Sequence, residues 1–222
     1  MTNQNQKDGV VLLHGILRSH LSMATLESRL KREGYRTLNL NYPSSRFSIE
    51  GLADRLHPKI DRFAKSLEGK VHFVTHSMGG LLTRTYIKRH RPTNLGRVVM
   101  QGPPNQGSEA TDFWKNTWLY KTLYGPAGQQ LGTCEKGPSA WNDVADYELG
   151  IIAGDSTFDF FHSSLIKGKD DGKVSVESTR LEGMTDHIVL PVTHSLMMYK
   201  KPVIHQTMYF LEHGRFDKDS SE

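Results

Sequence analysis

The sequence has little cysteine, no long apolar run and no pattern of metal ligands. Cys134 is the only cysteine among the 222 residues, so no intramolecular disulfide can form and no cysteine-based zinc site is indicated. We interpret Cys134 as an ordinary thiol. No apolar stretch reaches the roughly 20 residues that a membrane-spanning helix needs, and the polar residues 1–8 leave no room for a signal peptide. We therefore expect a soluble, cytoplasmic protein without stable membrane insertion.

Clustered charge and sequence repeats are also missing. The formal net charge is only +4, and lysine and arginine are scattered along the chain, which gives no footprint for nucleic-acid binding. No low-complexity tract is present apart from the polar tail at residues 217–222, which we expect to be disordered. The length suits one α/β domain that spans residues 1–222.

Apolar runs alternate with helical patterns along most of the chain. A continuous apolar run predicts a parallel strand that is covered on both faces. Helical stripes lie between these runs, and Pro58 is expected to kink or divide the second helix. The pattern predicts an α/β fold with a mainly parallel sheet of about six strands flanked by helices. The expected strands are residues 10–13, 35–41, 71–75, 97–101, 149–153 and 187–191.

One apolar run breaks abruptly at a serine and restarts as a helix. Residues 71–75 predict a buried strand and residues 81–88 a helix, which puts Ser77 on the sharp turn between them. Gly79 and Gly80 are small enough to let the helix pass close to the strand. This is the pattern of a nucleophile elbow, although Thr75 replaces the usual first glycine of G-x-S-x-G. The alternative is that Ser77 is simply the N-cap of the helix.

The alternation lapses over residues of about 103–148. This stretch is rich in glycine and proline and holds all three tryptophans of the chain. A long irregular insertion in a compact domain is usually functional, and we interpret it as a lid or cap. Trp114 and Trp118 are four residues apart, so on a helix they would share one face. That face either lines a substrate pocket or packs the insertion onto the sheet.

An acid and a histidine follow later strands. Asp171 lies in a loop after the fifth expected strand, and His194 follows the sixth. Asp155 and Asp170 are alternative acids, and we prefer His194 to His187 because His187 begins a strand rather than following one. Four further histidines are interpreted as structural, and His76 is expected to point away from Ser77 because neighbouring strand residues face opposite sides. These four are His57, His72, His76 and His90.

Taken together, these segments resemble those of α/β-hydrolase lipases and esterases, and the chain is similar to the compact bacterial members. The order of serine, acid and histidine along the chain is the order found in that fold. The resemblance covers nearly the whole chain and implies no cofactor and no metal. The segments that carry it are the elbow, His14-Gly15, Gly102-Pro103 to Gly107-Ser108, Asp171-Gly172-Lys173-Val174 and His194.

The resemblance also implies roles for individual residues. Ser77 would be the nucleophile, His194 the general base and then acid, and Asp171 the group that orients His194. The backbone N–H groups of Ile16 and Met78 would form the oxyanion hole. The function implied is hydrolysis of a carboxylic ester through an acyl-enzyme, with a small-molecule ester, acyl lipids included, as partner. An acyltransferase with the same triad and a catalytically silent binding protein are the alternatives.

Overall fold

The structure is a computed structural model that describes residues 8–133, 137–141, 143–157, 166 and 168–219. Cys134 and the end of the polar tail lie outside the described residues. Within the described residues, six parallel strands form one sheet in the order β2-β1-β3-β4-β5-β6. The predicted parallel α/β sheet is therefore confirmed. The strands are β1 (Gly9–Leu13), β2 (Arg36–Leu40), β3 (Val71–His76), β4 (Leu95–Gln101), β5 (Leu149–Gly154) and β6 (Asp186–Leu190).

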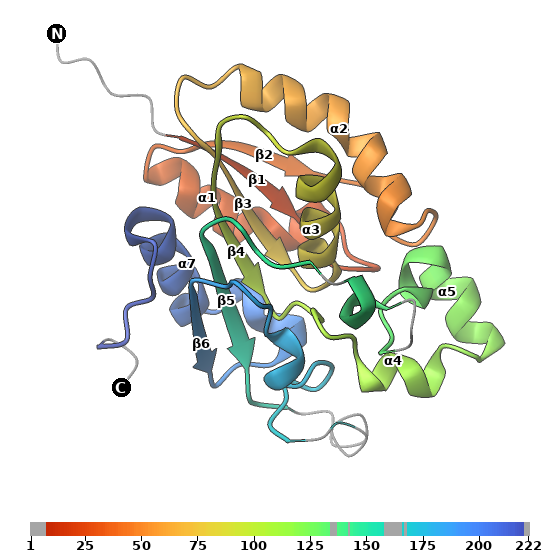
Figure 1. Cartoon of the computed structure of the whole chain (residues 1–222). Coiled ribbons are helices and arrows are strands. Elements are labelled where there is room, and N and C mark those ends of the chain that lie inside the picture. Colours follow the sequence, from red (N-terminus) through yellow and green to blue (C-terminus); the bar gives the residue numbers. More distant parts are fainter. Residues whose placement is uncertain (1–7, 134–136, 142, 158–165, 167, 220–222) are drawn as a thin grey trace, which may run out of the picture.

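Helices cover both faces of the sheet (Figure 1). On one face, α2 (Ile49–Lys65) and α3 (Met78–His90) pack on Val11, Leu13 and other side chains of the strands. On the other face, α1 (Ala24–Arg32) and α7 (Lys201–His213) pack on the alternate residues of the same strands. Burial on both faces explains why β1 contains only apolar residues and glycine. None of the helices in the described part of the chain has the length and apolarity needed to cross a bilayer.

Helix α2 continues through Pro58, so the expectation that Pro58 divides the helix is wrong. Leu52, Leu56 and Ile60 are buried and hold one side of the helix on the sheet, while Pro58 is on the exposed side. Proline removes one N–H donor from the helix. On the exposed side, the carbonyl group that loses this donor can be hydrated, and packing keeps the helix intact.

The described residues of the insertion include the helical segments α4 (Glu109–Trp114) and α5 (Trp118–Gln129), which lie beyond the carboxyl ends of the strands (Figure 1). Gly125, with φ 58° and ψ −158°, interrupts the second segment. The 3₁₀ turn η2 (Pro138–Trp141) follows them. The Thr117 hydroxyl caps α5 by accepting a hydrogen bond from the Tyr120 N–H at 3.3 Å. Trp114 ends one helix and Trp118 begins the next. The expectation that they share a helix face is therefore wrong.

Order extends further along the C-terminal segment than the sequence predicts. Asp217, the first residue of the polar tail, exchanges two backbone hydrogen bonds with the buried side chain of Gln206, at 2.6 and 2.9 Å. Its carboxylate also contacts His205 Nε2 at 3.1 Å. The tail is thus anchored to α7 at its first residue.

Candidate active site

Ser77 sits on a strained turn between β3 and α3. Its backbone has φ 54° and ψ −125°, a conformation that non-glycine residues rarely adopt. The turn is sterically possible because Gly79 and Gly80 lack side chains. A Cβ at Gly79 would lie 2.5 Å from the Leu13 carbonyl oxygen, and one at Gly80 would lie 2.9 Å from Pro103 Cβ. The Ser77 hydroxyl makes no capping hydrogen bond, so the N-cap alternative is wrong.

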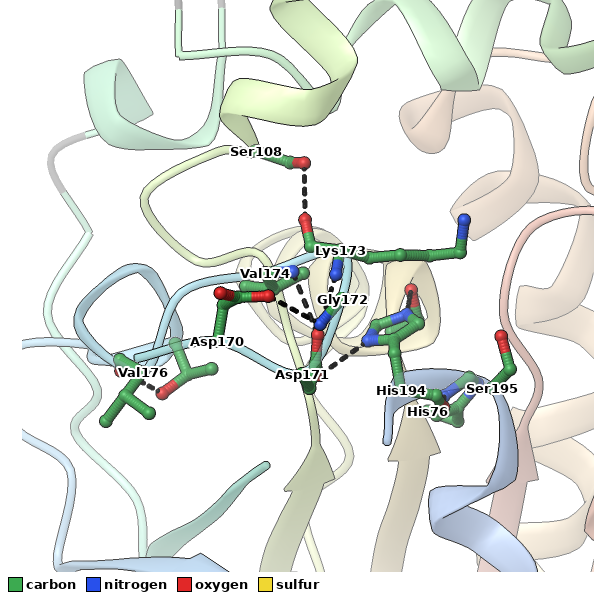
Figure 2. Close-up of polar contacts among 12 residues, drawn as sticks. His76, Ser108, Asp170, Asp171, Gly172, Lys173, Val174, Val176, His194 and Ser195 are labelled. Carbon is green, nitrogen blue, oxygen red and sulfur yellow. Dashed lines mark hydrogen bonds and ion pairs between the residues drawn. The ribbon is translucent and has the colours of Figure 1, made fainter. Parts of the chain in front are cut away.

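The structure brings Ser77, His194 and Asp171 together. His194 Nε2 lies 2.9 Å from Ser77 Oγ, and its Nδ1 lies 2.7 Å from Asp171 Oδ2. All three side chains are buried. The second carboxylate oxygen of Asp171 accepts hydrogen bonds from the backbone N–H groups of Lys173 and Val174 at 3.1 and 2.9 Å. Figure 2 shows Asp171 directed at His194 and held by this loop.

The alternative acids and base have other partners. Asp155 pairs with Lys169 at 3.2 Å, and Asp170 accepts a hydrogen bond from the Gly172 N–H at 2.7 Å. His187 contacts the Thr179 hydroxyl at 2.9 Å. None of these contacts involves Ser77 or His194. The geometry therefore favours Asp171 and His194 over the other candidates.

His76 faces His194, contrary to the expectation that it points away from Ser77. Its Nε2 lies 3.0 Å from the backbone carbonyl oxygen of His194, and the two ring centroids are 4.9 Å apart. His76 is the last residue of β3, so the chain leaves the strand's alternation at the next residue. Burial, followed by the charge of nearby His194, lowers the pKa of His76 well below its usual value. The ring is therefore neutral, and Nε2–H donates to the carbonyl oxygen.

The loop that carries Ile16 packs against the elbow. A Cβ added at Gly15 would lie 3.2 Å from Ser77 Cβ, which puts this loop directly beside the serine. The next residue, Leu17, has φ 54° and donates its N–H to Ser44 Oγ at 3.0 Å. Met78 is the first residue of α3. No hydrogen bond from the Ile16 or Met78 N–H to another residue in the described ranges is present, so both amides are available to a ligand.

Buried aromatic contacts hold the start of this loop. The Tyr42 hydroxyl donates a hydrogen bond to the His14 carbonyl oxygen, and the two rings stack at 4.0 Å. Burial lowers the pKa of His14 to about 4. His14 is therefore neutral at physiological pH and acts as a packed ring and hydrogen-bond acceptor.

A cavity of about 710 Å³ opens beside Ser77 and His194. Trp114 lines this cavity, whereas Trp118 does not and has 77% of its side-chain surface exposed. In the described part of the chain, no group of three side chains could hold a metal ion. The cavity walls are mostly apolar, and most of them come from the insertion. They include Ile16, Ala110, Trp114, Leu119, Tyr120, Leu123, Tyr124, Leu131 and Val174.

Sequence reasoning missed several residues of this site. His76, Ser44, Arg18 and Lys173 all contact or line it. Two of them carried a signal, because His76 adjoins Ser77 and Lys173 lies two residues after Asp171. Arg18 and Ser44 come from separate loops, and a single sequence shows no spacing that would join them to the site.

Comparisons with known proteins agree with this fold. Three solved structures share the fold: the mature form of the lipase BlEst2 from Bacillus licheniformis, a gene product (lin2722) from Listeria innocua and the phospholipase PlaB from Legionella pneumophila. The TM-scores are 0.70, 0.66 and 0.64, at 20%, 16% and 15% identity. A search of curated proteins finds no significant match.

Coverage differs among these structures. The alignments include 92%, 97% and 85% of this chain, and 89%, 97% and 53% of the respective structures, so the chain spans about half the length of PlaB. At such low identity the likeness shows the fold of the lipase and esterase group. The model of the palmitoyl protein thioesterase family matches residues 9–149. Because this match spans more than half of the sequence, the chain belongs to the palmitoyl protein thioesterase family of the α/β-hydrolase superfamily.

Proposed function

We propose that the protein is a serine hydrolase that cleaves carboxylic esters or thioesters through an acyl-enzyme. The observation that carries this proposal is the chain of contacts from Ser77 Oγ to His194 Nε2 at 2.9 Å and from His194 Nδ1 to Asp171 Oδ2 at 2.7 Å. It lies at an apolar cavity of about 710 Å³. The family and the fold both support hydrolysis of an ester or thioester.

Ser77, His194 and Asp171 each have a defined role in the mechanism. With Nδ1–H donating to Asp171, Nε2 of His194 has a free lone pair and accepts the Ser77 proton as Oγ attacks the carbonyl carbon. Asp171 fixes this tautomer and stabilises the imidazolium that forms. The two backbone N–H groups that already hold the second oxygen of Asp171 keep its carboxylate in place.

The amides of Ile16 and Met78 are proposed to stabilise the negative oxygen of the tetrahedral intermediate. Collapse of this intermediate breaks the bond to the leaving group, which takes the proton from His194 Nε2. Water then attacks the acyl-enzyme, with His194 accepting its proton, and releases the acid and Ser77. Water is replaced by an alcohol or thiol in the acyltransferase alternative.

The acyl chain is proposed to occupy the cavity formed with the insertion. Leu119, Tyr120 and Leu123 of α5 line it together with Trp114. Apolar walls favour an apolar acyl group, and each buried methylene contributes about 0.8 kcal/mol. In this proposal the insertion is the lid or cap of the site.

Labelling with a fluorophosphonate tests the proposal. The wild-type protein and a Ser28→Ala control on the exposed side of α1 should take up the label, and Ser77→Ala should not. Ser77→Ala should also lower turnover of p-nitrophenyl butyrate and of a butyryl thioester by about 10⁴-fold or more. Failure of the wild-type protein to react with the label, or near wild-type turnover by Ser77→Ala, would contradict the proposal. The first result would favour a binding protein with a hydrolase fold.

A further inference from the structure

Two cationic residues line the mostly apolar cavity. They are Arg18, which follows the loop that carries Ile16, and Lys173, which follows Asp171 by two residues. No carboxylate lies among the described residues that line the cavity. The charged groups at the cavity are thus of one sign, and a substrate would meet both of them.

Neither cation is neutralised by a carboxylate of the described residues, whereas many other cations on the surface are. Arg89, for example, binds Asp54 through two nitrogens at 3.0 and 2.9 Å, and Arg91 binds Asp146. The guanidinium of Arg18 donates one long hydrogen bond, 3.4 Å, to the Ser195 carbonyl oxygen. This leaves most of its five N–H donors available.

Lys173 combines an anchored backbone with an available ammonium group. Its N–H donates to Asp171, and its carbonyl oxygen accepts a hydrogen bond from the Ser108 hydroxyl at 2.8 Å. Figure 2 shows the side chain extended across the view from this anchored backbone, towards the side where Ser195 is drawn. The loop therefore fixes where the side chain starts, at a residue that lines the cavity.

Both cations belong to the part of the cavity around His194. Arg18 is bonded to the residue next to His194, and Lys173 belongs to the loop that holds the carboxylate partner of His194. Arg18 is also close enough for its charge to help lower the pKa of His76, after the larger effects of burial and of His194. In the mechanism proposed above, His194 gives its proton to the leaving group, so the leaving group must lie on this side.

We propose that Arg18 and Lys173 bind an anionic group, such as phosphate, sulfonate or carboxylate, on the alcohol or thiol part of the substrate. This inference rests on the proposed hydrolysis and defines its substrate class. The apolar wall from the insertion takes the acyl chain, and the cations take a negatively charged leaving group. Arginine can bind such oxygens through two N–H donors, and lysine acts as a point charge.

The partial exposure of Arg18 and Lys173 sets the size and the salt dependence of the preference for an anionic substrate. Arg18 is exposed and Lys173 is half-buried, so water and ions weaken their attraction for an anion. We expect each cation to raise kcat/KM for an anionic substrate by about 3- to 10-fold. The Debye length falls from about 30 Å at 0.01 M salt to about 3 Å at 1 M. The preference should therefore shrink as salt is added.

The test compares two esters that differ in charge and little else. The substrates are the octanoyl esters of 4-hydroxybenzenesulfonate, which is anionic, and of 4-hydroxybenzenesulfonamide, which is neutral. For the wild-type protein at low salt, kcat/KM should be about 10-fold or more higher for the anionic ester. Arg18→Gln and Lys173→Gln should each lower this ratio about 3-fold or more, and the double variant should bring it near 1. Arg18→Lys, which keeps the charge, should retain most of it.

Lys121→Gln provides the matched control. Lys121 is exposed on α5 and does not line the cavity, so its replacement makes the same change in net charge and should leave the ratio unaltered. An equal drop in this control would mean that overall charge, not the two cavity cations, sets the preference. A wild-type ratio of 1 or less, or a double variant with an undiminished ratio, would also overturn the inference.

A binding measurement separates this inference from the proposed hydrolysis. Titration calorimetry with the Ser77→Ala protein should show that octyl phosphate binds about 10-fold or more tightly than octanol, and that the double variant loses this difference. If both esters remain intact with the wild-type protein, the proposed hydrolysis fails, while the calorimetry still decides the anion site. Equal affinity for octyl phosphate and octanol would refute the site whatever the esters show.

Discussion

The ring of His76 lies against the ring of His194, with centroids 4.9 Å apart, and its Nε2 contacts the His194 carbonyl oxygen at 3.0 Å. A second backbone contact, from the His194 N–H to the Asp171 carbonyl oxygen at 2.9 Å, holds the same residue. The proposed base is therefore fixed through its main chain from two sides. His76 contributes one of these contacts by donating Nε2–H, and burial keeps its ring neutral.

Replacing His76 should affect the rate of catalysis more than the binding of substrate. His76→Phe keeps a ring but loses the donor to the His194 carbonyl oxygen. A small displacement of the base lowers the rate because proton transfer depends on its position. We expect kcat to fall about 10-fold with KM changed less than about 2-fold. His76→Gln, which retains an N–H donor, should recover part of the loss, and equal losses in both variants would contradict the positioning role.

The fold could be predicted from the sequence because the patterns that indicate strands and helices are local. A strand covered on both faces, such as β1, is a continuous apolar run whatever the rest of the chain does. The end of α7 also has a local signal, because Gly214 adopts the left-handed conformation, φ 70°, that glycine tolerates. The division of α2 at Pro58 was predicted wrongly because the outcome depends on which side of α2 faces solvent, and that is set by tertiary packing.

The site could be predicted only in part, because some of its features depend on tertiary structure and not on local sequence. The resemblance to α/β-hydrolases implied Ser77, Asp171 and His194, and the structure brings their side chains into contact. The orientation of His76 was predicted wrongly because alternation fails at the end of a strand. Trp114 and Trp118 were predicted to share a helix face. Their spacing alone cannot show that a new helix, capped by Thr117, begins between them.

A buried ion pair ties the far end of the insertion to α3. The guanidinium of Arg84, with a side-chain exposure of 1%, binds Asp143 and the carbonyl oxygen and side chain of Asn105. Asp143→Ala leaves this buried charge without its counterion and should lower the free energy of unfolding by about 3 kcal/mol. Asp146→Ala removes the partner of exposed Arg91 and should cost less than about 1 kcal/mol. Urea unfolding measures both, and equal losses would contradict the role of burial.

One buried histidine, His14, and one half-buried histidine, His187, predict a loss of stability in acid. Burial lowers the pKa of both His14 and His187 to about 4, from 6.5. Between these values the unfolded chain takes up protons that the folded protein excludes, so the free energy of unfolding falls as pH falls through this window. Each histidine contributes at most about 1.4 kcal/mol per pH unit. His187→Gln should therefore lose less stability than the wild-type protein between pH 7 and 5, by roughly 1 kcal/mol after allowance for partial exposure. A decline as steep as that of the parent protein would count against the lowered pKa.

The last prediction concerns how the cavity selects the length of the acyl chain. Trp114 lines the cavity, and Trp118 lies outside it with 77% of its surface exposed. Each methylene that the wall covers contributes about 0.8 kcal/mol, or about 4-fold in kcat/KM. We expect kcat/KM of the wild-type protein to rise from p-nitrophenyl acetate to the octanoate. Trp114→Ala should flatten this rise and change activity on the acetate little, because the acetyl group is too short to reach the wall.

Trp118→Ala is the matched control for this series, since it removes a tryptophan of the same insertion that has no place in the cavity wall. It should keep the wild-type rise with chain length. If Trp118→Ala flattens the rise while Trp114→Ala preserves it, the acyl chain runs along the outer surface of α5, and the cavity beside Ser77 is not the acyl site. If both variants keep the rise, selection lies deeper in the cavity, where Leu131 and Val174 form the wall, and Leu131→Ala becomes the variant that must flatten it.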